Sequence, residues 1–471
     1  MTAALTPAAD PTSTPGRGGG FTRQLAGNVA AMPVGGLPPA IVERARQGVL
    51  DYIGVAIAGS AEPGARISQQ LVAEDGSRPT STVLGTGLRS RPAGAALCNG
   101  LAAHSQDFDD SNPWAQGHTS VSVLSAALAL AEELGSSGME LLTAYVAGVD
   151  VAARIGVATG PGADRHGFHL TGITGAFGAA AACGRLLGLD IDGLQGALGL
   201  AATAASGIKG VFGTQGKHLN AARAAVEGML AARLVDRGFT APDEAITGAT
   251  GYCAGFTDTW DVARIDERMA GRNGMEDVVF KFYACCHGTH STIEGISRLR
   301  RERPFGVREV ERVVLRIPPV LRQICMIDRP TTGLTGKFSL QYVAALALAG
   351  RDTGPAAFTD EAVADPVIAG LIDRVELVDG EAALAARAPT DVLVELTSGE
   401  QLSASVNAVD PAPDAQLPGQ RTRLEQKFAA LAGPVIGESQ AAELAAAVAC
   451  LHETPTVAAV LRLAATGRTA S

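Results

Sequence analysis

The sequence predicts a mainly α protein, in which an all-helical domain built from both ends of the chain carries a smaller inserted α+β domain. From residue 92 to about residue 234 the apolar pattern is almost wholly helical, and it is helical again after residue 418. Between about residues 261 and 405, short alternating stretches typical of strands appear among helical segments. A chain of 471 residues is also too long for one typical core, so two domains are expected.

The helical domain is expected over residues 21–260 and 411–471. Residues 1–20 are rich in Pro, Gly and Thr and contain no apolar run, which predicts a disordered tail without a targeting signal. Residues 39–60 carry an amphipathic helical pattern. In the helix expected over residues 173–187, small residues recur at a spacing that lets another helix backbone approach closely; they are Gly175, Gly178 and Ala182.

The α+β lid domain is expected over residues 261–410. Residues 312–317 alternate between apolar and polar, and residues 375–378 form a second strand candidate. Residues 391–396 and 401–406 alternate on either side of Thr-Ser-Gly-Glu, which predicts a β-hairpin. Helical segments are expected near residues 339–348, 359–364 and 367–372, and a short strand or loop at residues 82–89.

The composition argues against several classes of function. The net charge of −10 disfavours nucleic acid as a partner, and no segment is convincing as a membrane span. The seven cysteines are scattered and contain no CxxC pair, which predicts reduced thiols in a cytoplasmic protein and no zinc site. The sequence has no GxSxG, HExxH or P-loop motif, and no GxGxxG motif after a strand, so nucleotide and flavin cofactors are unsupported.

Residues 104–120, HSQDFDDSNPWAQGHTS, form the stretch richest in chemistry. Asp107, Asp109, Asp110 and His118 stand here between two apolar helical segments. Buried carboxylates are costly unless they are paired or hydrogen-bonded. A proline and a glycine interrupt the helix, so these side chains are expected at a helix end and on a loop. The pattern fits an assembled site, and a solvated acidic turn is the alternative.

Three other stretches supply candidate site residues. His169 lies in a Gly-flanked loop before a helix, either as a functional imidazole or as a helix cap. Lys217 follows glycines at the start of an apolar helix. Lys281 stands among aromatic residues and precedes Cys286 and His290. It is either an edge-strand lysine facing water or a lysine whose depressed pKa makes it usable as a base or hydrogen-bonding acid. The CCHxxH spacing does not match a closed zinc site, so a metal-free site is expected.

A further stretch, residues 329–342, supplies two cations at a loop-to-helix entry. Arg329 and Lys337 are of the kind that holds anions at such an entry. An ordinary capped helix start explains the same pattern equally well.

Together these stretches resemble the MmgE/PrpD family, which contains 2-methylcitrate dehydratase, cis-aconitate decarboxylase and iminodisuccinate epimerase. The resemblance runs nearly end to end and is carried by the ordered combination HSxDFDD…GH, GFHxTG, GTQxK, KFYACC…TH and TGLxGKFSLQY. It implies a helical domain from both chain ends with an α+β lid, no cofactor, a homodimer, and a site between the two domains.

Five residues carry over directly from this resemblance. Asp107 matches the first acid of DFDD, His118 the histidine of GH and His169 the histidine of GFH. Lys217 and Lys281 match the two active-site lysines of the family. From the chemistry that such reactions need, we hypothesise that His118 and His169 are the acid and base pair, that Asp107 orients His118, and that the two lysines hold a substrate carboxylate.

The sequence departs from the family pattern at three places. Ser111 stands where cis-aconitate decarboxylases have Thr, and Cys286 stands where they have His, with His290 four residues later. Phe-Tyr-Ala-Cys follows Lys281 where 2-methylcitrate dehydratases resemble one another in having Phe-Pro-Ala-Glu. Ser111, Lys217, Cys286 and His290 are therefore expected to bind substrate, and Asp107, His118, His169 and Lys281 to be catalytic.

The resulting hypothesis is a cofactor-independent lyase of the dehydratase type. It would act on a small di- or tricarboxylate by removing a proton next to a carboxylate, with fixed cations stabilising the charge that develops. The alternatives are an epimerase of a dicarboxylate such as iminodisuccinate, a cis-aconitate-type decarboxylase, and a catalytically silent binding relative. A polycarboxylate is the expected partner of a cytoplasmic homodimer, with no nucleic acid, membrane or metal.

Overall fold

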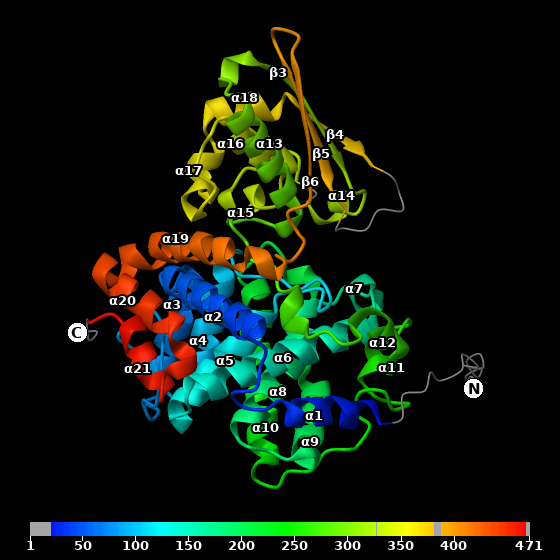
Figure 1. Ribbon diagram of the computed structural model, residues 1–471, viewed down its shortest axis with the longest axis vertical. Helices are drawn as coiled ribbons and strands as arrows, with labels where there is room; N and C mark the ends of the chain where they lie inside the picture. The colour runs from blue at the N-terminus through cyan, green and yellow to red at the C-terminus, as the bar shows by residue number, and fades with distance from the viewer. Residues whose placement is uncertain (1–19, 326, 381–387, 468–471) are drawn as a thin grey trace, which may run out of the picture.

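The structure is a computed structural model that describes residues 20–325, 327–380 and 388–467 (Figure 1). A large helical body occupies the lower part of the view, and a smaller part with helices and a sheet stands above it. The predicted mainly α class with a smaller α+β part is confirmed. The tail predicted over residues 1–20 lies outside the described residues, apart from Gly20.

The body is made of helices joined mostly by short loops. Its longer helices in chain order are α1 (Phe21–Ala31), α2 (Pro39–Gly59), α3 (Pro63–Glu74), α4 (Pro92–Ser105), α5 (Thr119–Leu134), α6 (Gly138–Thr159), α8 (Leu170–Leu186), α9 (Ile191–Ala204) and α10 (Gly216–Val235). Its shorter helices are α7 (Gly162–Arg165), α11 (Tyr252–Phe256) and α12 (Ala263–Met269). The stretch at residues 82–89 lies within a small antiparallel ladder of β1 (Ser81–Thr82) and β2 (Arg89–Ser90).

Helix α8 lies in the middle of the body, where it packs against α5, α6 and α10. A Cβ on Gly178 would lie 2.7 Å from the Gly148 carbonyl oxygen of α6, and a Cβ on Gly175 would lie 2.4 Å from Ser122 Oγ of α5. Side chains at these positions would push the helices apart, so the predicted close approach at the small residues of α8 is confirmed.

Helix α6 shows how apolar this bundle is. Its start is fixed by a capping box in which Ser137 and Glu140 each bond the other's backbone N–H. Among the described residues, α6 alone is long and apolar enough to cross a membrane, and 94% of its most apolar window is buried inside the protein. A central core helix passes the same test of length and composition.

The C-terminal segment returns to the body. Helix α19 (Leu417–Ile436) packs along α2, so closely that a Cβ on Gly54 would lie 2.9 Å from Phe428 Cδ2. Helices α20 (Glu438–Ala449) and α21 (Val457–Leu461) follow it across one side of the body (Figure 1). Both ends of the described chain therefore build the body, while the domain limits at residues 260 and 411 stay predictions.

The smaller part is built on a four-stranded sheet with strand order β4-β3-β5-β6. Its strands are β3 (Val310–Ile317), β4 (Val375–Asp379), β5 (Thr390–Leu396) and β6 (Gln401–Val406). β3 is parallel to β4 and antiparallel to β5, and β5 pairs with β6 as the predicted hairpin. The buried positions of β5 alternate, because only one face of the sheet meets the helices.

The helices of this part cover that inner face. α13 (His290–Glu302) packs on β5 and β6 and against α16 (Leu340–Leu348), and α16 contacts β4 and α18 (Pro366–Ile372). The short helices are α14 (Leu321–Ile324), α15 (Gly333–Gly336) and α17 (Asp360–Val363). The helices predicted near residues 339–348, 359–364 and 367–372 are confirmed.

Candidate active site

The loop of residues 106–118, between α4 and α5, carries the acidic residues of the candidate site. Asp107 adopts a left-handed backbone with φ 54°, which is uncommon for a residue other than glycine. Ser111 pairs with Val279 through two backbone hydrogen bonds of 2.9 and 2.8 Å. This pairing holds the acidic loop beside the segment that carries Lys281.

Asp107 joins the two predicted lysines. Its Oδ1 lies 2.6 Å from Lys217 Nζ and 3.3 Å from Lys281 Nζ, and all three side chains are at least nine-tenths buried. Burial raises the pKa of Asp107, but the two ammonium groups outweigh it and hold that pKa well below the usual range. Asp107 is therefore a carboxylate, and a pair of fixed cations flanks it.

Lys281 differs from the sequence hypothesis in its protonation. Burial lowers the pKa of Lys281, yet the nearby carboxylates of Asp107 and Asp109 raise it further, so that the net shift is upward. The expectation of a depressed pKa was wrong, because it considered only the aromatic neighbours in sequence. The raised pKa favours the ammonium form of Lys281, which suits the holding of anions better than the role of a base.

Lysines also hold the backbone of this loop. The carbonyl oxygens of residues 106, 107 and 108 accept hydrogen bonds from Lys337 (2.5 Å), Lys281 (2.8 Å) and Lys427 (2.8 Å) respectively. Lys427, on α19, is also paired with the Asp51 carboxylate at 2.6 Å. Segments far apart in the chain therefore fix three consecutive peptide groups.

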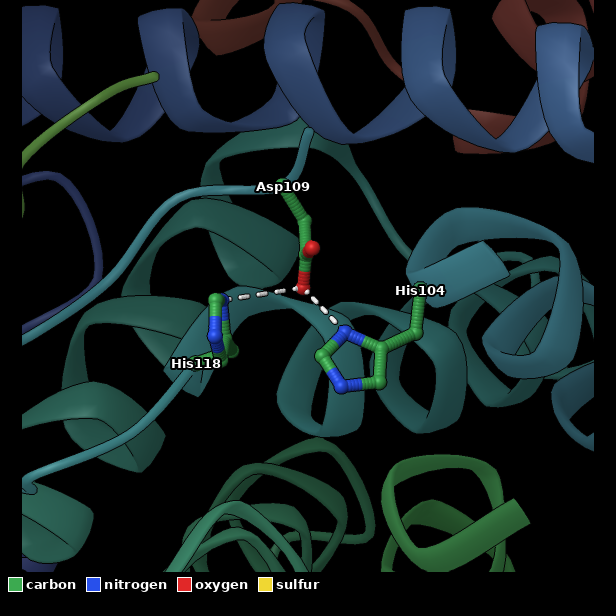
Figure 2. A group of neighbouring side chains, drawn as sticks. All are labelled: His104, Asp109 and His118. Carbon is green, nitrogen blue, oxygen red and sulfur yellow. Dashed lines mark hydrogen bonds and ion pairs between the residues drawn. The ribbon is translucent and has the colours of Figure 1, made fainter. Parts of the chain in front are cut away.

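A second acid of the loop, Asp109, lies between two histidines (Figure 2). Its Oδ2 is 2.8 Å from His104 Nδ1 and 3.3 Å from His118 Nδ1. Asp109, and not Asp107 as expected, is therefore the carboxylate paired with His118. The correction follows from the pairing of Asp107 with the two lysines, which leaves Asp109 as the carboxylate in contact with the imidazoles.

Hydrogen bonds set His118 and His169 in opposite tautomers. His118 Nδ1 lies 2.6 Å from the Asp110 carbonyl oxygen, which can only accept, so Nδ1 carries the proton and Nε2 has the free lone pair. Asn220 Nδ2 donates to the Ile208 carbonyl and lies 3.2 Å from His169 Nδ1. Since an amide N–H only donates, His169 Nδ1 accepts and Nε2 carries the proton. One ring therefore presents a base and the other a donor.

The imidazole rings gather around His104. The ring centroid of His104 lies 4.9 Å from that of His118, 6.0 Å from that of His169 and 5.9 Å from that of His218. Burial lowers the pKa of all four, well below the usual value for the first three and to about 4 for His218. The rings are therefore neutral at pH 7 in the protein as described, and an incoming anion would favour their protonation.

His118 and His169 each precede a helix. They are the N-cap residues of α5 and α8, and neither side chain caps its helix. The capping alternative for His169 is therefore wrong, and its ring is available to the site. Lys217 lies in the first turn of α10, so three helix N-termini, whose dipoles favour negative charge, converge on the cluster.

The residues after Lys281 form a second side of the cluster. Ser111 Oγ lies 2.6 Å from His287 Nδ1, and the His287 ring lies 4.5 Å from that of His290. Burial lowers the pKa of His287 to about 3 and that of His290 well below its usual value. A hydrogen bond from Cys325 lowers the pKa of the Cys286 thiol. His287 therefore places an imidazole in contact with Ser111, next to the thiol of Cys286 in the chain.

The third acid of the loop, Asp110, belongs to the core rather than to the cluster of imidazoles. It accepts hydrogen bonds from Ser120, whose Oγ lies 2.5 Å from Tyr145 Oη. Burial raises the pKa of Asp110 to about 7. Its side chain fixes the start of α5 behind His118.

A metal ion would have one candidate donor set among the described residues, His104, Asp109 and His118, whose ligand atoms lie within 4.8 Å of one another. Two histidines and a carboxylate suit a transition metal. Here, however, His104 Nδ1 is hydrogen-bonded to Asp109 Oδ2, and His118 Nδ1 donates to the Asp110 carbonyl oxygen. His104, Asp109 and His118 thus form a triad linked by one hydrogen bond and one ion pair.

The structure brings the predicted residues together with few exceptions. Asp107, His118, His169, Lys217 and Lys281 lie in one largely buried cluster, and Ser111, Cys286 and His290 adjoin it. Arg329 instead lies on the surface in an ion pair with Asp373. Sequence reasoning did not assign His104, Asp109, Asn220, His287 or Lys427 to the site, although the first two lie in the stretch it singled out.

A separate cavity of about 870 Å³ adjoins the segment that carries Lys281. Among the described residues that line it are Phe280, Phe282 and Tyr283, but not Lys281. Its polar lining includes Arg423, which pairs with Glu294 at 3.0 Å. Of the imidazoles in the cluster, only His290 is among the described residues that line this cavity, and Lys217, His118 and His169 are not.

Chemically, the cluster can bind carboxylates and move protons. Buried ammonium groups stabilise negative charge most strongly where water is excluded. One imidazole offers a lone pair and another offers a proton, both beside those cations. This combination suits reactions in which charge develops on a carbon next to a carboxylate.

Comparison with known proteins agrees with this chemistry. A family model described as the MmgE/PrpD N-terminal domain matches residues 23–264, and one described as the MmgE/PrpD C-terminal domain matches residues 283–453. Cis-aconitate decarboxylase of Mus musculus is 30% identical over 371 residues, covering 76% of this chain and 75% of the relative. The Homo sapiens enzyme of that name is 30% identical, covering 76% of each chain. The Aspergillus terreus enzyme is 26% identical and covers 94% of this chain and 96% of its own.

Proposed function

Because the chain belongs to the MmgE/PrpD family and is an enzyme of the lyase type, we propose that it decarboxylates a small unsaturated tricarboxylate of the cis-aconitate kind. The observation that carries this proposal is the convergence of Lys217 and Lys281 with two imidazoles of opposite tautomer. The family relatives named as cis-aconitate decarboxylases support decarboxylation over the dehydration that was put first from the sequence.

The proposed reaction needs cations and one proton. When cis-aconitate loses the carboxylate on its methylene carbon as CO₂, the released electron pair forms a new double bond. The electrons of the old double bond move onto the carbon next to another carboxylate, and that carbon then takes up a proton. The intermediate carries extra negative charge on that carboxylate. Lys217 and Lys281 stabilise this charge, and the closed surroundings strengthen the effect.

His118 is the proposed proton donor. Binding of a trianion favours protonation of the imidazole, and the Asp109 carboxylate, 3.3 Å from Nδ1, stabilises the imidazolium electrostatically. The proton on Nε2 is then delivered to carbon, and solvent restores it. His169 donates its Nε2–H to a substrate oxygen, with Asn220 holding its tautomer. The balance is one trianion and one proton giving a dianion and CO₂.

Dehydration remains the second candidate, and Cys286 is the observation that favours it. Decarboxylases resemble one another in having His at this position, and this chain has Cys. In that reaction His118 Nε2 would remove a proton next to a carboxylate, and His169 would protonate the leaving hydroxyl. His287 weighs against this reading, because its Nδ1 reaches Ser111 and restores an imidazole there.

Incubation with cis-aconitate in D₂O tests the proposal. We expect release of CO₂ and an unsaturated dicarboxylate carrying one deuterium, measured by proton NMR, and loss of both in the His118→Asn and Lys281→Met variants. The control for folding is the near-UV circular dichroism spectrum. If cis-aconitate stays intact while citrate or 2-methylcitrate loses water, dehydration replaces decarboxylation. Epimerisation of iminodisuccinate would support the isomerase alternative, and no reaction in the panel would support a silent relative.

The remaining expectations stay part of the proposal. A homodimer in the cytoplasm that works without a cofactor, nucleic acid or membrane is supported by the acidic composition and by the resemblance to the family. Size-exclusion chromatography with light scattering measures the oligomeric state directly.

A further inference from the structure

Lys337 is a buried cation beside the candidate site that the reaction proposed above does not use. It follows α15 in the smaller part of the protein, is 7% exposed, and donates from Nζ to the Gln106 carbonyl oxygen at 2.5 Å. The Lys337 carbonyl in turn accepts from the Cys286 N–H at 2.9 Å. These two bonds hold Lys337 against both the acidic loop and the segment that carries Lys281.

Each of the neighbouring lysines forms an ion pair with a carboxylate, and Lys337 does not. Lys217 and Lys281 share Asp107, and Lys427 pairs with Asp51. For Lys337, no carboxylate oxygen of any residue that the structure describes lies within the 4.0 Å limit of an ion pair. Asp107 and Glu62 act on Lys337 only from beyond that limit, and a buried charge without a carboxylate in contact is costly, so its retention calls for a reason other than the stability of the fold.

The position of Lys337 suits a ligand that also reaches Lys217. Lys217 Nζ lies 5.7 Å from the ring centroid of Phe338, the residue next to Lys337. Both lysines act electrostatically on Asp107 and on His218. Lys217, Lys281 and Lys337 thus all act on the carboxylate of Asp107, so it is shared among three ammonium groups. Burial lowers the pKa of Lys337 to about 8, so the group is largely charged at pH 7.

We propose that Lys337 binds a carboxylate of the substrate different from the one held by Lys217 and Lys281, and so selects tricarboxylates over dicarboxylates. The proposal rests on the proposed function, since it assumes that the cluster takes a polycarboxylate. In the ligand-free protein the Gln106 carbonyl occupies one of the three N–H donors of the ammonium group. A carboxylate that approaches the others forms a charge-assisted hydrogen bond in a dry site.

A structural role for Lys337 makes a different prediction. If its bond to Gln106 mainly held the smaller part onto the body, Lys337→Met would lower the thermal unfolding temperature. If Lys337 serves a ligand, that variant removes an unpaired buried charge, keeps the apolar stem, and leaves the ligand-free protein at least as stable. Lys427→Met is the matched control, because it breaks a buried pair with Asp51 and is expected to be destabilising.

Three probes that lack the reacting double bond test which carboxylate is bound. Propane-1,2,3-tricarboxylate carries all three groups, glutarate lacks the central one, and methylsuccinate lacks a terminal one. We measure their affinities by calorimetry for the full chain and for Lys337→Met. The variant should bind the tricarboxylate about thirty-fold or more weakly, as expected when one partner of a buried charge pair is removed.

The pattern across the probes decides the matter. We expect Lys337→Met to weaken binding of the tricarboxylate and of one dicarboxylate. Its affinity for the dicarboxylate that lacks the carboxylate bound by Lys337 should be unchanged. Lys337→Arg should retain part of the affinity, because it keeps the charge. Four results would each overturn the inference. Lys337→Met could leave the affinities for all three probes unchanged, or lower all three equally. It could also lose thermal stability as Lys427→Met does, or the unaltered chain could fail to bind the tricarboxylate.

The same proteins separate this inference from the proposed reaction. If the unaltered chain binds propane-1,2,3-tricarboxylate and Lys337→Met does not, but cis-aconitate releases no CO₂, then the role of Lys337 stands and the reaction is wrong. If cis-aconitate is decarboxylated and Lys337→Met leaves both KM and the affinities unchanged, then the reaction stands and the role of Lys337 is wrong.

Discussion

Replacing Asp107 by Asn tests the electrostatic core of the site. The change removes the carboxylate that Lys217 Nζ approaches to 2.6 Å and Lys281 Nζ to 3.3 Å. Breaking a buried pair by removing one partner costs about 3–5 kcal/mol, because the remaining charge stays buried. For a chain of 471 residues the unfolding entropy is about 1 kcal/mol per kelvin, so the unfolding temperature should fall by about 3–5 °C at pH 7.

The pH dependence of this loss has a definite sign. Burial lowers the pKa of Lys281, and Asp107 is the largest influence that raises it, so in Asp107→Asn the folded-state pKa falls below the unfolded value of about 10.4. The unfolded chain then binds more protons than the folded one between those two pKa values. Stability of the variant therefore rises with pH across that window. The difference in unfolding temperature between the variant and the unaltered protein should therefore become smaller from pH 7 to pH 10.

Differential scanning calorimetry at several pH values measures both effects. The matched control is Asp192→Asn, which breaks an ion pair with Arg23 of similar length, 2.6 Å, between side chains that are 78% and 56% exposed. An exposed pair contributes little, so no clear change is expected there. If Asp107→Asn costs no more than Asp192→Asn, or if its cost is the same at pH 7 and pH 10, the electrostatic account of the site is refuted.

Three further changes test other features of the structure. Asn220→Ala removes the donor that holds the tautomer of His169, so kcat should fall about ten- to a hundred-fold with KM nearly unchanged, and an unaltered kcat would contradict the tautomer assignment. Gly178→Val overpacks the crossing of α6 and α8 and should lower stability to urea by about 1–3 kcal/mol, whereas Gly196→Ala, whose Cβ would meet only ordinary contacts, should not. Dialysis against a chelator should leave turnover unchanged, and a loss restored by a divalent metal would show that the triad around Asp109 holds one.

Much of the fold followed from local pattern. Helical periodicity located the long helices, and Thr-Ser-Gly-Glu between alternating residues located the hairpin of β5 and β6. Close packing at Gly178 was also predictable, because small residues at helical spacing in an apolar helix typically mark a close contact with another helix. These features depend on residues near one another in the chain, which sequence reasoning can compare directly.

The pairing of charges depended on the distant parts of the chain and was harder to predict. Asp107 and Asp109 are two residues apart, and nothing local says which one meets the lysines. The left-handed backbone at Asp107 turns the chain there, which sends its side chain to Lys217 and leaves Asp109 to the histidines. The raised pKa of Lys281 has the same origin, since the carboxylates that cause it lie more than 170 positions away.

The three lysines that bond the carbonyls of residues 106–108 have a consequence for biosynthesis. The loop is made early, but Lys427, which bonds the carbonyl of residue 108, lies 319 positions further on, in α19. A nascent chain that has not yet released that helix from the ribosome lacks one of the three supports. The loop therefore acquires all three lysine contacts only after Lys427 has been made, and products that terminate before this residue would lack one of them.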